Sequence, residues 1–210
     1  MGLVGFLGEA LAISLSGVIA PGPMTAVTAG EGARSPYAGV LVALGHGLVE
    51  VPLMIGLLFG LGAVLEIPAV RVAVGLAGSL FLLWMGVGML RGLRAGDTRS
   101  FAGRRSPLAA GAALSAGNPY FLLWWATVGA TLVSRSAVHG ALGFALFAVG
   151  HWLCDLVWCS LVAYLSFRGK QLLGGRVGLG IAAICAIALI GFGGRFAYDA
   201  IVGLIRLTSG

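Results

Sequence analysis

The sequence predicts an all-α polytopic membrane protein, with six transmembrane helices arranged as two inverted-topology repeats of three helices. Three observations predict this fold: the composition, six apolar runs of membrane-spanning length, and an internal duplication. Of the 210 residues, 59% are hydrophobic and 10% are charged, whereas soluble domains are usually about 25% charged. The 36 glycines are typical of membrane helices that pack closely against one another.

Six apolar runs reach the ~20 residues that a helix needs to cross a bilayer. They cover residues 8–30, 37–62, 70–90, 108–133, 139–166 and 177–203. The longest polar stretch between them contains the basic segment 94–107. We therefore expect one integral membrane domain, with a first three-helix repeat at 1–93, a cytoplasmic linker at 94–107, and a second repeat at 108–210.

Basic residues predict the orientation. Nine of the 13 lysines and arginines fall in the loops after the first, third and fifth runs: Arg34, Arg91, Arg94, Arg99, Arg104, Arg105, Arg168, Lys170 and Arg176. The positive-inside rule makes these loops cytoplasmic. Both termini are then extracytoplasmic, in a protein of the plasma (inner) membrane. Contact with membrane lipid accounts for the net charge of +6, so a nucleic-acid partner is not expected, and a homodimer is an allowed assembly.

The duplication is clearest in the second and fifth runs. Residues 45–50 read G-H-G-L-V-E, and residues 150–155 read G-H-W-L-C-D. A shift of 105 residues aligns them, and the same shift aligns Arg71 with Arg176. One offset that serves separate spans indicates an internal repeat. Because each copy holds three spans, the second copy must cross the membrane in the opposite sense, as in secondary transporters.

Prolines predict a break in the first and fourth helices. The first run contains L-S-G-V-I-A-P-G-P (15–23), and the fourth contains L-S-A-G-N-P (114–119). Proline removes a backbone donor and clashes with the carbonyl four residues back, so new half-helices should begin at Met24 and Tyr120. Their free N–H groups suit a substrate carboxylate. The carbonyls that the prolines free, that of Ser115 among them, suit an ammonium group or a metal ion. The predicted substrate-binding residues are Pro21, Gly22, Pro23, Met24, Thr25, Ser115, Asn118, Pro119 and Tyr120. The alternative is that these prolines only shape helix packing.

Four ionisable residues lie inside the second and fifth runs. His46 and Glu50 are four residues apart and share one helix face, as do His151 and Asp155. Charges within a membrane usually mark a substrate, ion or proton path. One interpretation is that the carboxyls take up and release protons and the histidines tune them. Another is that all four are ligands of a divalent metal such as zinc. A third is that each pair only bonds neighbouring helices. His139 is given no role.

Other side chains near the breaks are expected to play smaller parts. Serines and threonines, Ser14 and Ser16 among them, more often bond their own backbone or a neighbouring helix than a substrate. Trp124, Trp125, Trp152 and Trp158 either shape the cavity or fill helix packing, and packing is the favoured role. No nucleophile stands at a convincing spacing from a base, so an enzyme is not expected.

With these motifs, the chain resembles the lysine exporter (LysE/RhtB) family of amino-acid efflux transporters. P-G-P in the first span and N-P in the fourth carry the resemblance, together with the basic loop between the halves. Asp155 stands where the family often has an intramembrane aspartate, and Tyr120 stands where members commonly have lysine. The resemblance implies proton-driven export of an amino acid or similar small solute by alternating access, with no cofactor. The alternative is export of a divalent metal. The paired histidines and the absence of the lysine favour this alternative.

Overall fold

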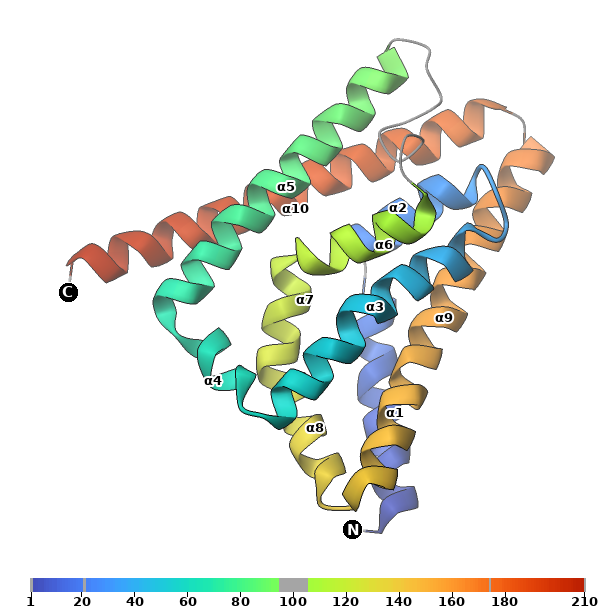
Figure 1. Cartoon of the computed structure of the whole chain (residues 1–210). Coiled ribbons are helices and arrows are strands. Elements are labelled where there is room, and N and C mark those ends of the chain that lie inside the picture. Colours follow the sequence, from blue (N-terminus) through green and yellow to red (C-terminus); the bar gives the residue numbers. More distant parts are fainter. Residues whose placement is uncertain (1, 21, 95–105, 174, 210) are drawn as a thin grey trace.

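The computed structural model describes residues 2–20, 22–94, 106–173 and 175–209, and every secondary-structure element within them is helical. Pro21 and most of the predicted linker 94–107 lie outside the described residues. In chain order the elements are α1 (Leu3–Ile19), α2 (Pro23–Gly32), α3 (Ala38–Leu58), α4 (Leu61–Glu66), α5 (Pro68–Arg94), α6 (Pro107–Ala116), α7 (Pro119–Trp124), the π-helical turn η2 (Trp125–Gly129), α8 (Ala130–Ala137), α9 (Gly140–Leu173) and α10 (Gly175–Ser209) (Figure 1).

Four of these helices, α3, α5, α9 and α10, are long and apolar enough to cross a membrane. The bent pair α1 and α2 makes a fifth candidate when it is taken as one span. These elements confirm an all-helical, multi-pass membrane protein. The fourth predicted span is divided into α6, α7, η2 and α8, and none of these pieces is long enough to cross on its own. A count of six spans therefore stays a prediction.

Both predicted helix breaks are present. The axes of α1 and α2 differ by 68°, and α6 ends three residues before α7 begins. Each new helix begins on a proline, Pro23 or Pro119, one residue earlier than expected. A proline suits the first helical position because its missing N–H would have no helical partner there. Asn118 caps α7 by accepting a hydrogen bond from the Tyr120 N–H at 3.1 Å.

The π-helical turn η2 was not predicted. It widens the helix for five residues before α8 resumes the α-helical pattern, and it holds the buried Trp125. Such turns insert extra residues into a helix without ending it.

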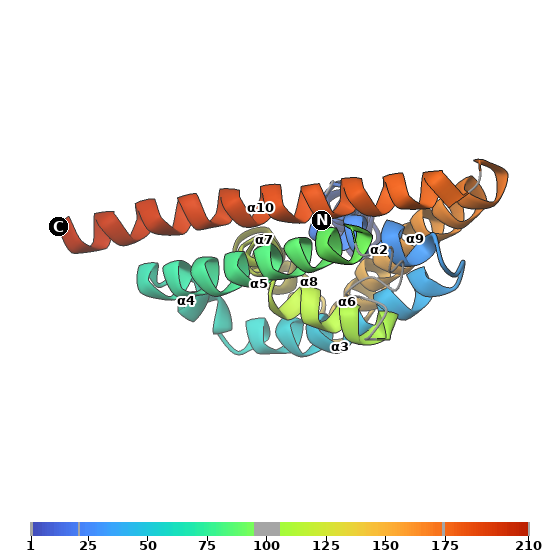
Figure 2. The ribbon, with the colours of Figure 1, turned by 90° about the horizontal axis from the view of Figure 1, so that it is seen from above.

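Glycines allow helix backbones to come into direct contact. A Cβ atom on Gly45 of α3 would overlap the carbonyl oxygen of Leu108 in α6, and one on Gly111 of α6 would overlap the carbonyl oxygen of Val42 in α3. The same holds for α5 and α10, which lie side by side in Figures 1 and 2, with Gly86 against the backbone of α10. Small residues at helix contacts are the usual means of close packing in membranes.

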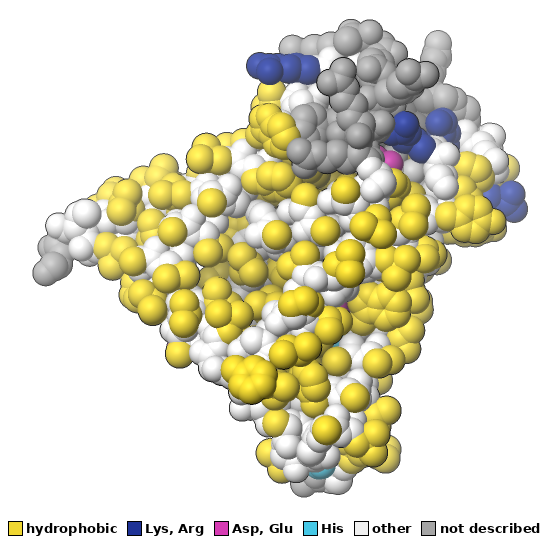
Figure 3. All heavy atoms as spheres, viewed as in Figure 1, with side chains coloured by type: hydrophobic (Ala, Val, Ile, Leu, Met, Phe, Trp, Pro, Cys, Tyr) yellow, Lys and Arg dark blue, Asp and Glu magenta, His cyan; other side chains and the backbone are white. Residues whose placement is uncertain are grey.

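The face seen in Figure 3 combines a large apolar area with a basic end. Figure 3 shows hydrophobic side chains over most of the visible face, and lysine and arginine side chains gathered at its upper end. In Figure 1 the ends of α2, α5 and α9 point toward that same end of the molecule. Large apolar side chains such as Leu48, Leu80 and Val157 are exposed along the helices, as lipid contact requires.

The α3–α6 contact generates a stability prediction. We expect Gly45→Ala to lower the free energy of unfolding by about 1–3 kcal/mol, because the added methyl group meets backbone that cannot move aside cheaply. The measurement is thermal unfolding of the purified protein in detergent. Gly191→Ala on α10 is the matched control, because a Cβ there has no neighbour within 4 Å. Equal melting temperatures for the two variants would contradict the described packing.

Candidate functional site

The four predicted ionisable residues meet at the contact between α3 and α9. His46 and Glu50 lie one turn apart on α3, and His151 and Asp155 lie one turn apart on α9. All four are buried, and Glu50 has no exposed surface at all. We call these four residues the quartet. A 105-residue separation in sequence thus becomes direct contact in the structure.

Both imidazoles of the quartet contact the same carboxylate oxygen. Glu50 Oε1 lies 3.0 Å from Nε2 of His46 and 3.1 Å from Nε2 of His151. Asp155 lies slightly farther away, with its Oδ1 3.7 Å from Nε2 of His46 and its Oδ2 3.6 Å from Nε2 of His151. Each histidine therefore contacts the acid of its own helix and the acid of the other helix.

Two serines fix the other side of each imidazole ring. Nδ1 of His46 lies 2.6 Å from the hydroxyl of Ser115 in α6, and Nδ1 of His151 lies 2.7 Å from the hydroxyl of Ser14 in α1. Both hydroxyls donate their only hydrogen to the carbonyl four residues earlier, Gly111 or Ala10. With the hydroxyl hydrogens assigned in this way, each hydroxyl accepts from its histidine, and Nδ1 carries a hydrogen in both rings.

This arrangement determines where a variable proton or cation sits. With Nδ1–H fixed in both rings, each Nε2 meets Glu50 either as a lone pair or as a second N–H. Glu50 Oε1 holds at most one hydrogen while two nitrogens contact it. At least one imidazole must then carry hydrogens on both nitrogens, unless a cation lies between the groups. Two further oxygens, Glu50 Oε2 and Asp155 Oδ2, are buried without a hydrogen-bond partner among the described residues.

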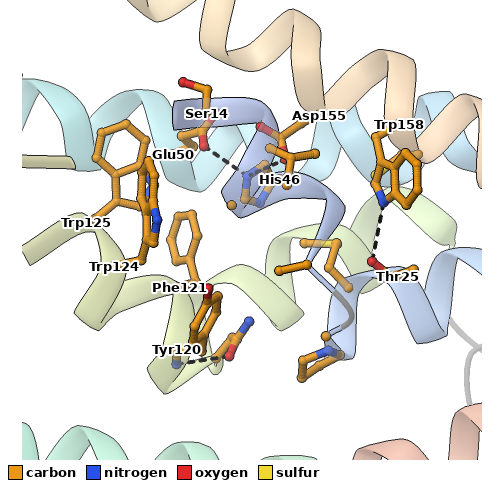
Figure 4. Close-up of a pocket in the computed structure, with 18 of the residues that line it drawn as sticks. Ser14, Thr25, His46, Glu50, Tyr120, Phe121, Trp124, Trp125, Asp155 and Trp158 are labelled. Carbon is orange, nitrogen blue, oxygen red and sulfur yellow. Dashed lines mark hydrogen bonds and ion pairs between the residues drawn. The ribbon is translucent and has the colours of Figure 1, made fainter. Parts of the chain in front are cut away.

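The quartet lies in the wall of a cavity of about 90 Å³ (Figure 4). A buried water needs about 10–15 Å³ by this measure, so the cavity has room for about six to nine water-sized groups. Aromatic side chains form much of the wall: Tyr120, Phe121, Trp124, Trp125 and Trp158. Phe121 lies edge-on to His46, with ring centres 5.0 Å apart, and Trp125 lies edge-on to His151 at 4.9 Å.

Most of the residues predicted at the helix breaks line this same cavity. They are Gly22, Pro23, Met24, Thr25, Asn118 and Tyr120. Two predicted substrate contacts do something else. Ser115 bonds His46, and the ring of Pro119 packs against Gly78 of α5. The carbonyl of Ser115, which Pro119 was expected to free, still accepts a long hydrogen bond from the Asn118 N–H at 3.5 Å.

Sequence reasoning missed the role of several residues. Trp124, Trp125 and Trp158 line the cavity, which is the less favoured of the two roles expected for them; Trp152 packs, by donating to the carbonyl of Ala43. The shared L-S letters pair Ser16 with Ser115, but the structure pairs Ser14 with it. Ser16 is exposed and bonds only its own helix. A shift of 101 residues, which aligns Ser14 with Ser115 and Ala10 with Gly111, was the available signal.

The family of the chain follows from comparison with known proteins. A family model described as LysE type translocator matches residues 15–200. The chain belongs to the LysE type translocator family. This translocator is therefore a membrane transporter and not an enzyme, as the sequence predicted.

Two relatives are similar along nearly the whole translocator. One is the putative amino acid efflux protein YcgF of Bacillus subtilis, 25% identical over 201 residues, which cover 93% of this chain and 95% of the relative. Another is the chemotactic transduction protein ChpE of Pseudomonas aeruginosa, 29% identical over 189 residues, which cover 84% of this chain and 89% of the relative. No solved structure matches the translocator.

The serine contacts predict a spectroscopic result. With ¹⁵N-labelled histidine, both His46 and His151 should show a protonated Nδ1. We expect Ser115→Ala to change the signals of His46 and Ser14→Ala to change those of His151, each leaving a buried N–H without its acceptor at a cost of about 1–3 kcal/mol. Ser16→Ala, on the same helix as Ser14, is the control and should change neither. Unchanged histidine signals in both serine variants would refute the assignment of Nδ1–H.

Proposed function

We propose that the translocator exports an amino acid or a similar small solute in exchange for protons, with the quartet as the proton-carrying site. The observation that carries this proposal is the contact of both Nε2 atoms with one carboxylate oxygen, Glu50 Oε1, in a fully buried position. Buried charge in a membrane is costly unless it is compensated, so this cluster needs positive charge at every stage of transport.

The charge count explains how protons would be exchanged. With neutral imidazoles the quartet carries two negative charges, from Glu50 and Asp155. A second proton on each imidazole makes the quartet neutral as a whole. Loss of one proton leaves one negative charge, which a positively charged group in the cavity can compensate. Proton and solute then compete for the same carboxylates, and such competition couples their movement in opposite directions.

Alternating access is the second part of the proposal. His46 with Ser115 and His151 with Ser14 repeat one arrangement in the two halves of the chain. This agreement supports two three-helix repeats of opposite orientation, with the quartet and the broken helices at their interface. Rocking of one repeat against the other would expose the cavity to each side in turn.

The proposal also covers the orientation of the translocator in the membrane and the direction of transport. The basic end of the molecule would face the cytoplasm and its anionic lipid, which places both termini outside the cytoplasm of a cell with the protein in its plasma (inner) membrane. The name of the Bacillus subtilis relative, an amino acid efflux protein, supports an amino acid or related solute and the outward direction. No cofactor is required by this mechanism, and a homodimer would leave each cavity complete within one chain.

The proposal predicts the effect of neutralising each acid. In proteoliposomes, Glu50→Gln and Asp155→Asn should each reduce solute flux driven by a pH gradient at least about tenfold, because each removes a charge that the cation must replace. A screen of amino acids with and without the gradient identifies the solute first.

Glu66→Gln is the control for that experiment, because Glu66 is exposed at the end of α4. Solute flux through the Glu66→Gln variant should equal that of the wild type. Retained folding is checked by thermal unfolding. Wild-type flux in both quartet variants would exclude the quartet from proton coupling.

A divalent metal is the second candidate for the transported solute, and one observation favours it. Four groups joined around a tetrahedral zinc ion, with bonds of about 2.0–2.1 Å, lie about 3.3–3.4 Å from one another. His46, Glu50 and Asp155 each offer one ligand atom, and these three atoms lie within 4.8 Å of one another; Nε2 of His151 lies 3.1 Å from Glu50 Oε1. A serine hydroxyl that holds the far nitrogen of each histidine is also the kind of support that metal-binding histidines have. Two neutral imidazoles, two carboxylates and one divalent ion form a neutral unit.

The metal candidate makes its own prediction. Purified protein should bind zinc or nickel with one ion per chain in calorimetry and elemental analysis, and His46→Ala should weaken that binding at least about tenfold by removing a ligand. His139→Ala should bind metal like the wild type, since His139 lies against Phe6 at a ring distance of 5.6 Å and outside the quartet. Absence of binding to the wild type would remove the metal candidate.

A further inference from the structure

We propose that the cavity recognises its solute by a positively charged amino group, and that small aliphatic amines without a carboxylate are substrates in their own right. The inference rests on the proposed transport function and narrows its substrate class. It is carried by the charge, the aromatic wall, the unpartnered oxygens and the size of the cavity beside the quartet.

The charge of the lining favours a cation. Two carboxylates, Glu50 and Asp155, line the cavity, and none of its described lining residues is a lysine or arginine. Arg34, at the end of α2, lies instead beside Glu31 at 3.9 Å. Once the quartet has released one proton it keeps one net negative charge, so an entering carboxylate would be repelled, whereas an ammonium group would be attracted.

The aromatic wall favours the same charge. Tyr120, Phe121, Trp124, Trp125 and Trp158 surround the cavity beside the acids (Figure 4). The faces of aromatic rings attract cations, tryptophan most strongly, and the attraction grows when water is excluded. The combination of aromatic rings and carboxylates in a small cavity is the chemistry that proteins use to hold ammonium groups.

Two buried oxygens have hydrogen-bonding capacity to spare. Glu50 Oε2 and Asp155 Oδ2 have no hydrogen-bond partner in the described part of the chain, although Glu50 is fully buried and Asp155 is 7% exposed. Buried acceptors are normally satisfied. Each of these oxygens has less than 1 Å² of accessible surface, so an ammonium group in the cavity acts on them through its charge, which replaces the positive charge that the quartet loses when a proton leaves.

Donors for a substrate carboxylate are uncharged. They are the N–H groups of Met24 and Thr25 in the first turn of α2, the Asn118 amide and the Tyr120 hydroxyl, while the indole N–H of Trp158 is directed at the Thr25 hydroxyl at 3.5 Å. A carboxylate on the solute can thus be accommodated, but it meets no lysine or arginine among the described lining residues. The space for about six to nine water-sized groups fits an amine of the size of isopentylamine or an amino acid of the size of leucine.

The test compares four solutes of one shape. Isopentylamine, leucine, 4-methylpentanoate and 3-methylbutan-1-ol share a branched carbon chain but carry, respectively, an amine, an amine with a carboxylate, a carboxylate alone, and an uncharged hydroxyl. Binding to the full-length protein in detergent is measured by calorimetry. We expect isopentylamine to bind at least as tightly as leucine and at least about tenfold more tightly than the acid or the alcohol.

Variants locate the binding in the cavity. Trp124→Leu should weaken isopentylamine binding about fivefold or more and leave binding of the alcohol nearly unchanged, because it removes a ring that attracts charge. Trp84→Leu is the matched control, since Trp84 is half exposed on α5 and outside the cavity lining. Equal losses in the two variants would overturn the placement of the amine.

Three results would overturn the inference: no binding of isopentylamine, equal or tighter binding of 4-methylpentanoate, or leucine binding more than about tenfold tighter than isopentylamine. Its failure is distinct from failure of the proposed function. Proton-driven leucine flux without amine binding removes only this inference. Amine binding without proton-driven flux of any tested solute removes the proposed proton coupling and leaves the amine site.

Discussion

The contact of two imidazoles with one buried carboxylate oxygen is the interaction on which the rest of this structure depends. A chain with 10% charged residues places four ionisable side chains where water is scarce, and that is stable only when their charges sum to nearly zero. Two positive charges are needed to balance the two acids. Because the serines contact Nδ1 of each histidine, the proton that makes each imidazole positive is carried on Nε2. This charge balance is the reason that the proposed function gives the site a cation at every stage of transport.

The helix packing serves this contact. Gly45 stands one residue before His46 and lets α3 touch the backbone of α6, which brings Ser115 within reach of the histidine. Gly150 holds the corresponding position before His151 on α9, where a Cβ would press on Leu11 of α1, the helix that supplies Ser14. The breaks at Pro23 and Pro119 turn the chain around the quartet and leave room for the cavity. The glycines and prolines that set the helix packing are thus the residues that position the quartet.

The composition and the repeat made the class of the fold and the four members of the quartet predictable from sequence. The i, i+4 spacing placed each pair on one helix face, and the shared 105-residue offset indicated that the pairs correspond. The sequence did not reveal that Ser14, and not Ser16, completes the second pair. That choice depends on the rotation of α1 about its axis, which is set by packing against α9. Likewise η2 carries Trp125 into the core, and no periodic pattern in residues 125–129 distinguishes a π-turn from an α-helix.

The central claim is that solute and protons compete for the carboxylates of the quartet. The most direct test measures the protons released when leucine or isopentylamine binds to the purified protein in weakly buffered solution. The account predicts release in proportion to the solute bound, and loss of this release in Glu50→Gln. Binding of either solute to the wild type with no release of protons at any pH near neutrality would contradict it.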